Sequence, residues 1–198
     1  MTTMIEEKVM AEVEETLRRA PEITVVDAPY EVPEEKSGKL DYIWAALRIG
    51  VGWTFLWAFL DKTFALGFAT EAGKGWIDGG SPTYGYLTFA TKGPFADFFA
   101  GMAGSVTVEW LFMVGLLGIG MTLMLGIGVR VGAISGAVML VLMYASSAIL
   151  PEHNPFLDDH LINAVILLGI AIGLPGYRLG VGRYFAKSRL ATRFPLLK

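Results

Sequence analysis

The sequence contains no cysteine and only two histidines, and charged residues make up just 18% of its 198 positions. The absence of cysteine excludes disulfides, thiolate metal sites, iron–sulfur clusters held by the chain itself and dithiol redox exchange. The low charge argues against a soluble globular protein, in which about a quarter of the residues are charged. Hydrophobic residues account for 54% of the chain and gather in blocks. The composition therefore indicates a membrane protein.

Four windows approach the roughly 20 mostly apolar residues that a membrane-spanning helix needs. They cover about residues 41–60, 105–127, 129–150 and 161–177. The last window is short and spans the bilayer only if it stands upright or if Arg178 snorkels at its end. We therefore predict an all-α integral membrane protein, a bundle of four transmembrane helices with an outward-facing cap between the first and second helices.

The predicted cap, residues 61–104, is aromatic and rich in glycine and proline. Lys92, Pro94 and Asp97 interrupt its apolar run, so we expect no fifth span there. Short interfacial helices are expected instead. Their apolar residues would be Leu87, Phe89, Phe95, Phe98 and Phe99.

The two flanks of the chain differ in charge. Residues 1–40 contain ten acidic and five basic residues and no apolar core, so we expect no cleaved signal peptide. We assign residues 1–39 to a cytoplasmic acidic arm, residues 40–183 to the membrane domain and residues 184–198 to a basic cytoplasmic tail. Within the arm, apolar residues recur every four positions, which predicts a short amphipathic helix. A linker follows it. The apolar residues with that spacing are Ile5, Val9, Val13 and Leu17.

The orientation follows from lysine and arginine near the ends of the spans. Six basic residues and no acidic residue follow Tyr177, so the positive-inside rule places the C-terminus in the cytoplasm. With four spans, the N-terminus is cytoplasmic as well. We expect a multi-pass protein of the plasma membrane.

Glycines predict where the helices approach one another, because small residues let backbones come close in lipid. Two groups of glycines stand in the second and third spans. They are Gly115, Gly118 and Gly120, and Gly128, Gly132 and Gly136. We interpret both groups as packing faces of the bundle, and homodimerisation through one of them is an alternative.

Two ionisable residues lie inside predicted spans. Arg48 is about eight residues into the first span, where a charge costs at least ~2.5–3.5 kcal/mol, so it should face the bundle interior. It either ties helices together or binds a ligand. Glu109 is about five residues into the second span, where it would be protonated, paired with a cation or exposed to a water-filled pocket. Lys62 is the cation predicted to lie at the most similar depth in the membrane. One helical stripe, with steps of four and three, holds Arg48, Gly52, Phe55, Phe59 and Lys62.

The segment NPFLDDH, residues 154–160, precedes the last predicted span. Asp158, Asp159 and His160 would occupy the first turn of that helix, where carboxylates interact favourably with the helix dipole. Capping is one interpretation. Proton relay is the other, because a histidine beside carboxylates can accept and release protons near neutral pH. His153 and His160 do not suit a haem held by this chain, and we assign no metal site.

The predicted topology brings the ends of three spans to one membrane face, with Asp61 and Lys62, Glu109 and the NPFLDDH segment. Four tryptophans fall near the same level. An aromatic belt explains them, and so does a flat pocket for a quinone ring. They are Trp53, Trp57, Trp76 and Trp110.

Together with the four-span pattern, the segments LRIGVGWTFLWAFLDK and NPFLDDHLINA resemble the DoxX/DoxD family of small membrane proteins. The resemblance covers about residues 40–183 and is closest to members described as the DoxD-type large subunit of thiosulfate:quinone oxidoreductase. It implies a four-helix membrane bundle, sometimes with a small partner subunit, that passes electrons from thiosulfate to a membrane quinone and makes tetrathionate.

On that resemblance, His160 with Asp158 would deliver protons to the reduced quinone and Glu109 would connect the site to water. Membrane quinone is the expected electron acceptor, and no haem or iron–sulfur cluster is expected from this chain. No residue is a redox centre, so electrons would pass directly between bound substrates or through a partner's cofactor. The candidate residues for binding substrate or quinone are Arg48, Lys62, Asp61, Trp57, Trp110 and Asn154.

Two other functions fit the same residues. The first is a non-catalytic scaffold or accessory subunit of a redox complex, whose charged tails recruit cytoplasmic proteins. The second is a small-molecule or proton transporter, although four short helices leave little room for alternating access without dimerisation. In each case we expect the chain to lie in the lipid bilayer. The expected protein partner is a small subunit or a second copy of the chain. We expect no nucleic acid partner.

Overall fold

The computed structural model describes residues 38–147, 149, 156–173 and 179–188, together with Met10, Glu15 and Arg193. The chain divides into two compact units, Met1–Lys36 and Ser37–Lys198. The amphipathic helix predicted for residues 5–17 lies outside the described residues, apart from Met10 and Glu15, and so does the linker that follows it. The described residues form helices, turns and loops, and none lies in a strand. The all-α prediction is confirmed for this part of the chain.

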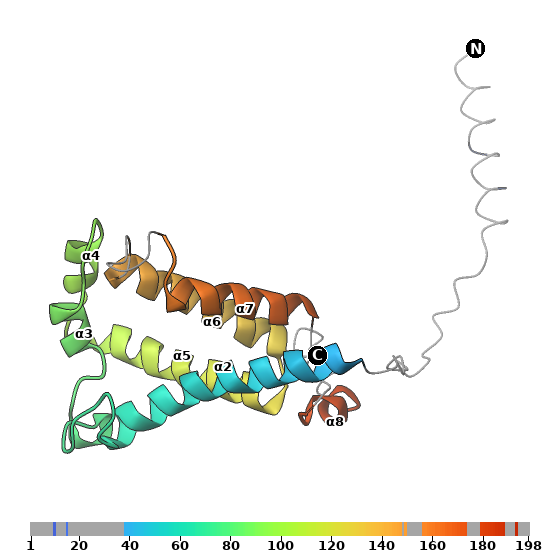
Figure 1. Cartoon of the computed structure of the whole chain (residues 1–198), viewed down its shortest axis with the longest axis horizontal. Coiled ribbons are helices and arrows are strands. Elements are labelled where there is room, and N and C mark those ends of the chain that lie inside the picture. The colour runs from blue at the N-terminus through green and yellow to red at the C-terminus, as the bar shows by residue number, and fades with distance from the viewer. Residues whose placement is uncertain are drawn as a thin grey trace, which may run out of the picture. The chain divides into compact units, whose positions relative to one another are not determined.

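Four apolar helices dominate the second unit (Figure 1). They are α2 (Lys39–Phe64), α5 (Val106–Leu125), α6 (Val129–Ser147) and α7 (Asp159–Gly173). The first three are long and apolar enough to cross a membrane. With its 15 described residues, α7 is about 22 Å long, which is less than the ~30 Å hydrocarbon thickness of a bilayer. The described residues thus contain three candidate spans and one shorter apolar helix.

The segment between α2 and α5 contains only short helices. They are η1 (Trp76–Asp78), α3 (Tyr84–Phe89) and α4 (Ala96–Ala100). The prediction that this segment holds no fifth span is confirmed, and α3 and α4 contain four of the five apolar residues expected to form short helices here. A last short helix, α8 (Gly182–Ala186), follows α7. It includes the boundary predicted between residues 183 and 184.

Side-chain and backbone caps define the two ends of α2. At its start, the carboxylate of Asp41 accepts a hydrogen bond from the backbone N–H of Gly38 at 3.1 Å. This contact places negative charge beside the positive end of the helix dipole. At its end, Ala65 adopts a left-handed conformation with φ of 51°, and its N–H donates to the carbonyl of Asp61 at 2.9 Å.

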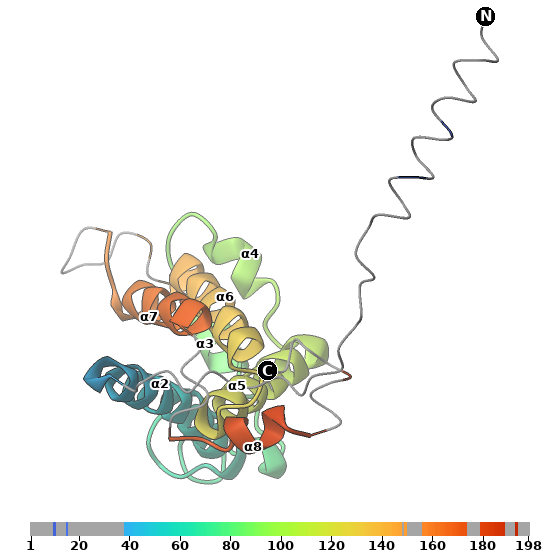
Figure 2. The ribbon, with the colours of Figure 1, turned by 90° about the vertical axis from the view of Figure 1, so that its right-hand side faces the viewer.

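Each long helix packs against two others. Among these four helices, α5 contacts α2 and α6, and α7 contacts α6 and α2, so α5 and α7 lie on one diagonal (Figure 2). Phe55 lies near the centre, because a side chain added at Gly136 of α6 would meet Phe55, Ile119 and Leu167 together. All four helices therefore contribute to one apolar core. Its buried residues from α2 and α5 are Val51, Phe55, Met113, Leu116, Ile119 and Leu123.

Glycines allow the closest helix approaches. A Cβ added at Gly120 would lie 2.8 Å from the backbone nitrogen of Leu56, and one at Gly52 would lie 2.7 Å from Cβ of Leu123. A Cβ at Gly132 would collide with the hydroxyl of Thr122. The predicted packing role is confirmed for Gly115, Gly120, Gly132 and Gly136. Gly128 lies in the turn before α6 with a positive φ of 64°. Gly118 has no heavy atom within 4 Å of an added Cβ, because it lies on the exposed side of α5.

The helices are apolar on their outer sides as well as in the core. The exposed outer residues of α5 include Leu111, Val114 and Met121, and those of α7 include Val165, Leu168 and Ile172. Contiguous apolar surface of this kind is unfavourable in water. A helix that is apolar on all sides is expected where lipid surrounds it. The structure therefore indicates a bilayer environment.

The two ends of the bundle differ in how closely the helices approach. In Figure 1 the α2–α5 pair and the α6–α7 pair lie close together near the start of α2 and diverge toward α3 and α4. Near the first end, the ring of Trp44 on α2 fills the position that a Cβ at Gly169 of α7 would occupy. The helix ends that carry the predicted site lie at the diverging end.

Candidate functional site

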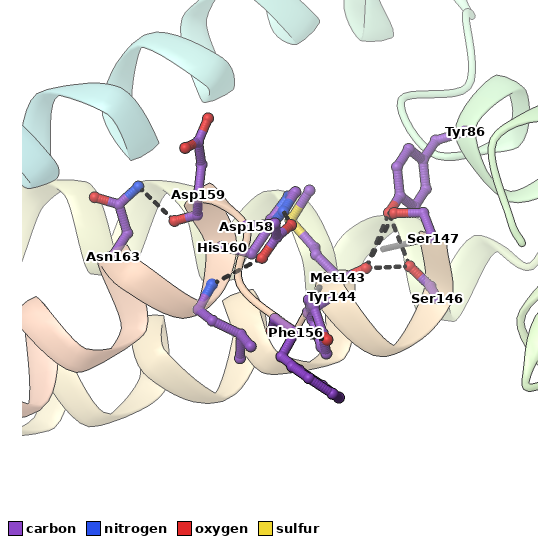
Figure 3. Close-up of polar contacts among 11 residues, drawn as sticks. Tyr86, Met143, Tyr144, Ser146, Ser147, Phe156, Asp158, Asp159, His160 and Asn163 are labelled. Carbon is purple, nitrogen blue, oxygen red and sulfur yellow. Dashed lines mark hydrogen bonds and ion pairs between the residues drawn. The ribbon is translucent and has the colours of Figure 1, made fainter. Parts of the chain in front are cut away.

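The carboxylate of Asp158 makes two hydrogen bonds at the start of α7. Its Oδ1 accepts from the backbone N–H of Leu161 at 3.1 Å, which is the bond of a helix N-cap. Its Oδ2 lies 2.6 Å from Nδ1 of His160 (Figure 3). Asp158 thus caps the helix and orients the histidine at the same time. The predicted first turn is confirmed for Asp159 and His160, whereas Asp158 is the residue that precedes it.

The geometry of this pair suits proton transfer. Binding of Nδ1 by a carboxylate fixes the orientation of the ring, as in other acid–base histidines. The second ring nitrogen, Nε2, makes no hydrogen bond with any described residue. The side chains of His160 and Asp158 are 29% and 15% exposed. The histidine can therefore reach a substrate or water while its partner stays largely covered.

A cluster of hydroxyl groups joins the predicted cap to the end of α6 (Figure 3). The hydroxyl of Tyr86 on α3 lies 2.8 Å from Oγ of Ser146 and 2.7 Å from Oγ of Ser147. Both serines also donate to the carbonyl of Met143, at 2.8 and 3.2 Å. The backbone N–H of Lys92 donates to the carbonyl of Ser146 at 2.9 Å. These contacts hold residues 86–92 against α6.

The hydroxyl cluster was not predicted from the sequence. Its only signal is the pair Ser146–Ser147 at the end of an apolar run, where hydroxyl side chains need partners. In the view of Figure 3, Met143 lies between this cluster and the His160–Asp158 pair. The next residue, Tyr144, donates from its hydroxyl to the carbonyl of Phe156 at 3.2 Å, which ties the segment before α7 to α6.

Glu109 lies in the first turn of α5 and is half-buried. Its carboxylate accepts a hydrogen bond from the hydroxyl of Ser81, and Oγ of Ser81 accepts one from the backbone N–H of Tyr84 at 3.0 Å. The pairing of Glu109 with Lys62 suggested by their depth is not seen. A serine of the loop before α3 comes closer than the lysine of α2, so the contact fixes the loop to α5.

Arg48 is completely buried, as predicted for a charge inside a span. Its guanidinium donates to the carbonyls of Leu123 and Met124, the latter at 3.4 Å, and to the carbonyl of Leu179 at 3.1 Å. The first two carbonyls belong to the last turn of α5, whose carbonyls have no partner within the helix. Arg48 therefore ties α2 to α5 and to the segment before α8. It lies toward the opposite end of the bundle from His160.

Asp61 and Lys62 end α2 at the diverging end. The buried carboxylate of Asp61 accepts hydrogen bonds from the backbone N–H groups of Phe68 and Ala69, at 3.2 and 3.0 Å. These contacts fold the following loop back onto the helix. Lys62 is half-buried in the last turn of α2, where a cation interacts favourably with the helix dipole.

Lys74 and Glu71 form an exposed ion pair in the loop after α2, with 2.6 Å between Nζ and Oε2. The hydrogen bond from Lys74 lowers the pKa of the Glu71 carboxyl below its usual value, and the charge of Lys74 adds to the effect. Much of the positive charge of Lys74 is therefore compensated locally.

The tryptophans form two separate aromatic contacts. The ring of Trp57 lies 5.7 Å from that of Trp53 and 5.0 Å, edge to face, from that of Phe68. The rings of Trp76 and Trp110 lie 4.5 Å apart, also edge to face. The first contact lies on α2 and the loop that follows it. The second joins η1 to α5.

The structure thus brings several of the predicted site residues to one end of the four helices, but it does not bring them into one cluster. His160 and Asp158 are in direct contact, whereas Glu109 belongs to α5, on the diagonal from α7. Arg48 lies toward the other end, and Asn154 lies outside the described residues. Among the described residues, no group of three or more histidine, aspartate or glutamate side chains could hold a metal ion.

No family model, curated protein or solved structure matches this chain.

Proposed function

We propose that this chain is a subunit of a membrane oxidoreductase that passes electrons from a small reduced sulfur anion such as thiosulfate to a membrane quinone. The observation that carries the proposal is the His160–Asp158 pair, with 2.6 Å between Nδ1 and Oδ2, at the end of a set of apolar helices. The resemblance of LRIGVGWTFLWAFLDK and NPFLDDHLINA to the DoxX/DoxD family supplies the substrate class.

The proposal includes a topology. The four helices α2, α5, α6 and α7 form a transmembrane bundle in the plasma membrane, and the segment from α2 to α5 is a cap on the outer face. Both termini are cytoplasmic, which agrees with the basic residues at the end of the chain. The described part of α7 is short, so the bilayer thins beside it or polar groups snorkel at its ends.

In the proposed reaction, two thiosulfate anions join through a new sulfur–sulfur bond to give tetrathionate and release two electrons. The quinone takes up these two electrons with two protons and becomes the quinol. Electrons pass directly between the bound substrates or through a cofactor of a partner subunit. Lys62 offers the positive charge at this end of α2 that attracts the anions.

His160 supplies the protons. Its Nε2 donates to a reduced quinone oxygen, and Asp158 holds the ring in place for the transfer through its contact with Nδ1. Water at this end of the bundle then protonates the ring again, because the histidine is partly exposed. The aromatic contacts of Trp57 and of Trp110 flank the path along which a quinone ring reaches this end from the lipid.

The second candidate is a non-catalytic membrane scaffold or accessory subunit. It is favoured by a different observation, namely that the polar candidates make local structural contacts. Asp158 caps α7, Glu109 fixes the loop at Ser81, and Arg48 joins helix ends. In this case substitution of His160 changes stability or partner binding and has no effect on electron transfer.

The deciding measurement is the thiosulfate-dependent reduction of a soluble quinone analogue by membranes that contain the full chain. We expect His160→Ala to lower the rate by about 10²–10⁴-fold, the usual contribution of a general acid. Asp158→Asn keeps a capping side chain but removes the charge beside the histidine, and should lower the rate as well.

Asp159→Asn is the matched control, because it removes the same charge one residue away without touching the pair. It should keep the parent rate. Equal rates for the parent and His160→Ala membranes, at equal amounts of folded protein, would contradict the role of the pair. Absence of thiosulfate-dependent reduction by the parent would favour the scaffold.

A further inference from the structure

The segment that carries α8 is fixed to the end of the long helices. The backbone N–H of Val181 donates to the carbonyl of Leu125, the last residue of α5, at 2.9 Å. The carbonyl of Leu179 accepts a hydrogen bond from Arg48 at 3.1 Å. Because α5 carries no charged residue between Trp110 and its end at Leu125, that end marks the level where hydrocarbon gives way to headgroups. These two bonds hold residues 179–188 at that level.

The side chains of this segment are of two kinds. Leu179, Val181 and Tyr184 are exposed, by 56%, 45% and 69%. Arg183 and Lys187 are exposed as well, and residues 179–188 contain no acidic residue. The guanidinium of Arg183 lies 5.5 Å from the centre of the Tyr184 ring. The segment thus presents apolar and cationic groups side by side.

A third cation lies at the same end of the molecule. Arg130 is exposed in the first turn of α6, which begins four residues after the end of α5. The turn between the two helices is tight, with positive φ at Gly126 and Gly128, so the start of α6 remains close to the end of α5. The cations therefore belong to two segments that both meet the end of α5.

We propose that residues 179–188 form a binding site for the headgroups of anionic phospholipids, with Arg183 and Lys187 as the phosphate contacts and Arg130 as a third cation. Exposed apolar side chains enter the boundary of the acyl chains, while the cations meet the phosphates above them. Each lysine or arginine near an anionic surface strengthens such binding. This inference does not depend on the proposed redox function.

The acidic residues 1–40 of the same chain are the competing occupant. They contain five more acidic than basic residues, 10 − 5, and so could neutralise the same cations. They would cover Leu179, Val181 and Tyr184 only if the predicted apolar residues Ile5, Val9, Val13 and Leu17 packed on this segment, whereas a lipid surface at the end of α5 meets both kinds of side chain without a further segment. The observations therefore favour lipid.

A local fluorescence measurement tests the site. Because the chain has no cysteine, Ala186→Cys provides a single position for a fluorophore beside the cations. The labelled full-length protein is reconstituted in phosphatidylcholine bilayers, and headgroup-spin-labelled phosphatidylglycerol or phosphatidylcholine is added as the quencher. We expect half-maximal quenching at a mole fraction of phosphatidylglycerol at least about fivefold lower than that of phosphatidylcholine.

The variant Arg183→Gln with Lys187→Gln should abolish this preference, and Lys74→Gln, which removes a cation from the loop after α2, should leave it unchanged. Raising NaCl from about 0.05 to about 0.5 M should weaken the preference in the parent. Equal quenching by the two lipids in the parent would overturn the proposal, and is the result expected if residues 1–40 occupy the site. A preference that survives the double substitution, or that is lost when inorganic phosphate replaces chloride at equal ionic strength, would overturn it as well.

Discussion

At the level of single residues, the carboxylate of Asp158 makes two bonds that substitutions can separate. Asn retains an oxygen for the N–H of Leu161, so Asp158→Asn should keep nearly the full free energy of unfolding. Asp158→Ala removes the cap and should lower that free energy by about 1 kcal/mol. The measurement is unfolding of the detergent-solubilised protein followed by circular dichroism. Equal losses for the two variants would show that the bond to His160, and not the cap, stabilises the start of α7.

Some of these residue roles could be predicted from the sequence. A buried charge needs partners, so the interior position of Arg48 followed from its place in the first span, and the first turn of α7 followed from NPFLDDH. The partners themselves could not be predicted. Arg48 binds backbone carbonyls, and every residue has a carbonyl, so the sequence contains no signal for Leu123 or Leu179. Ser81 and Tyr86 act through loop contacts that have no periodic pattern.

At the level of helices, two glycines of α5 offer a matched test of packing. Gly120→Ala places a methyl group 2.8 Å from the backbone nitrogen of Leu56, which cannot move away without shifting α2. We expect a loss of about 1–3 kcal/mol in the free energy of unfolding. Gly118→Ala meets no heavy atom within 4 Å and should be neutral or slightly stabilising, because alanine favours helix. Thermal unfolding in detergent distinguishes the two variants. Equal effects on the free energy of unfolding would contradict the close approach of α2 and α5 at Gly120.

A second helix-level prediction concerns Arg48. Arg48→Met removes the hydrogen bonds to the last turn of α5 and to Leu179, and should destabilise the protein by about 2–3 kcal/mol. Because the bond to Leu179 helps to hold the following residues, the amide hydrogen of Val181 should also exchange faster with solvent. Hydrogen–deuterium exchange with mass spectrometry measures this. Lys62→Met removes a cation from the same helix and should leave that exchange unchanged.

The helices were the most predictable level of the structure. Long apolar runs need internally bonded backbones in lipid, so the extents of α2, α5 and α6 followed within a few residues from hydropathy alone. The start of the last helix also followed within two residues, and the end of its predicted window, residues 174–177, lies outside the described residues. Gly118 was assigned to a packing face because spacing alone cannot distinguish a glycine that faces a helix from one that faces lipid.

At the level of the whole molecule, the absence of cysteine allows the proposed topology to be tested directly. Asp97→Cys lies in the cap, and Lys187→Cys lies at the other end, after α8. In intact cells, a membrane-impermeant maleimide should label Asp97→Cys, and Lys187→Cys only after the membrane is permeabilised. Labelling of both positions in intact cells would exclude a four-span topology. Labelling of Lys187→Cys in intact cells, with Asp97→Cys labelled only after permeabilisation, would show that the orientation is the opposite of the proposed one.

The arrangement of the whole molecule was predictable in outline only. Because consecutive helices alternate in direction, the end of α2 and the starts of α5 and α7 lie on one side, as the structure shows. The diagonal placement of α5 and α7 separates Glu109 from His160, and it depends on the order in which helices pack around the core. Helices that are apolar on all sides give no sequence signal for that order.

The bonds of Arg48 have a consequence for biosynthesis. The carbonyls of Leu123 and Leu179 lie 75 and 131 residues further along the chain. A ribosome that adds about 5–20 residues per second makes the first of them roughly 4–15 s after Arg48. In the proposed topology, α2 enters the membrane during that interval with its arginine solvated by headgroups or water, and the arginine reaches its buried position only after α5 is made. Insertion of α2 into the membrane is therefore expected to precede its packing against α5 by several seconds.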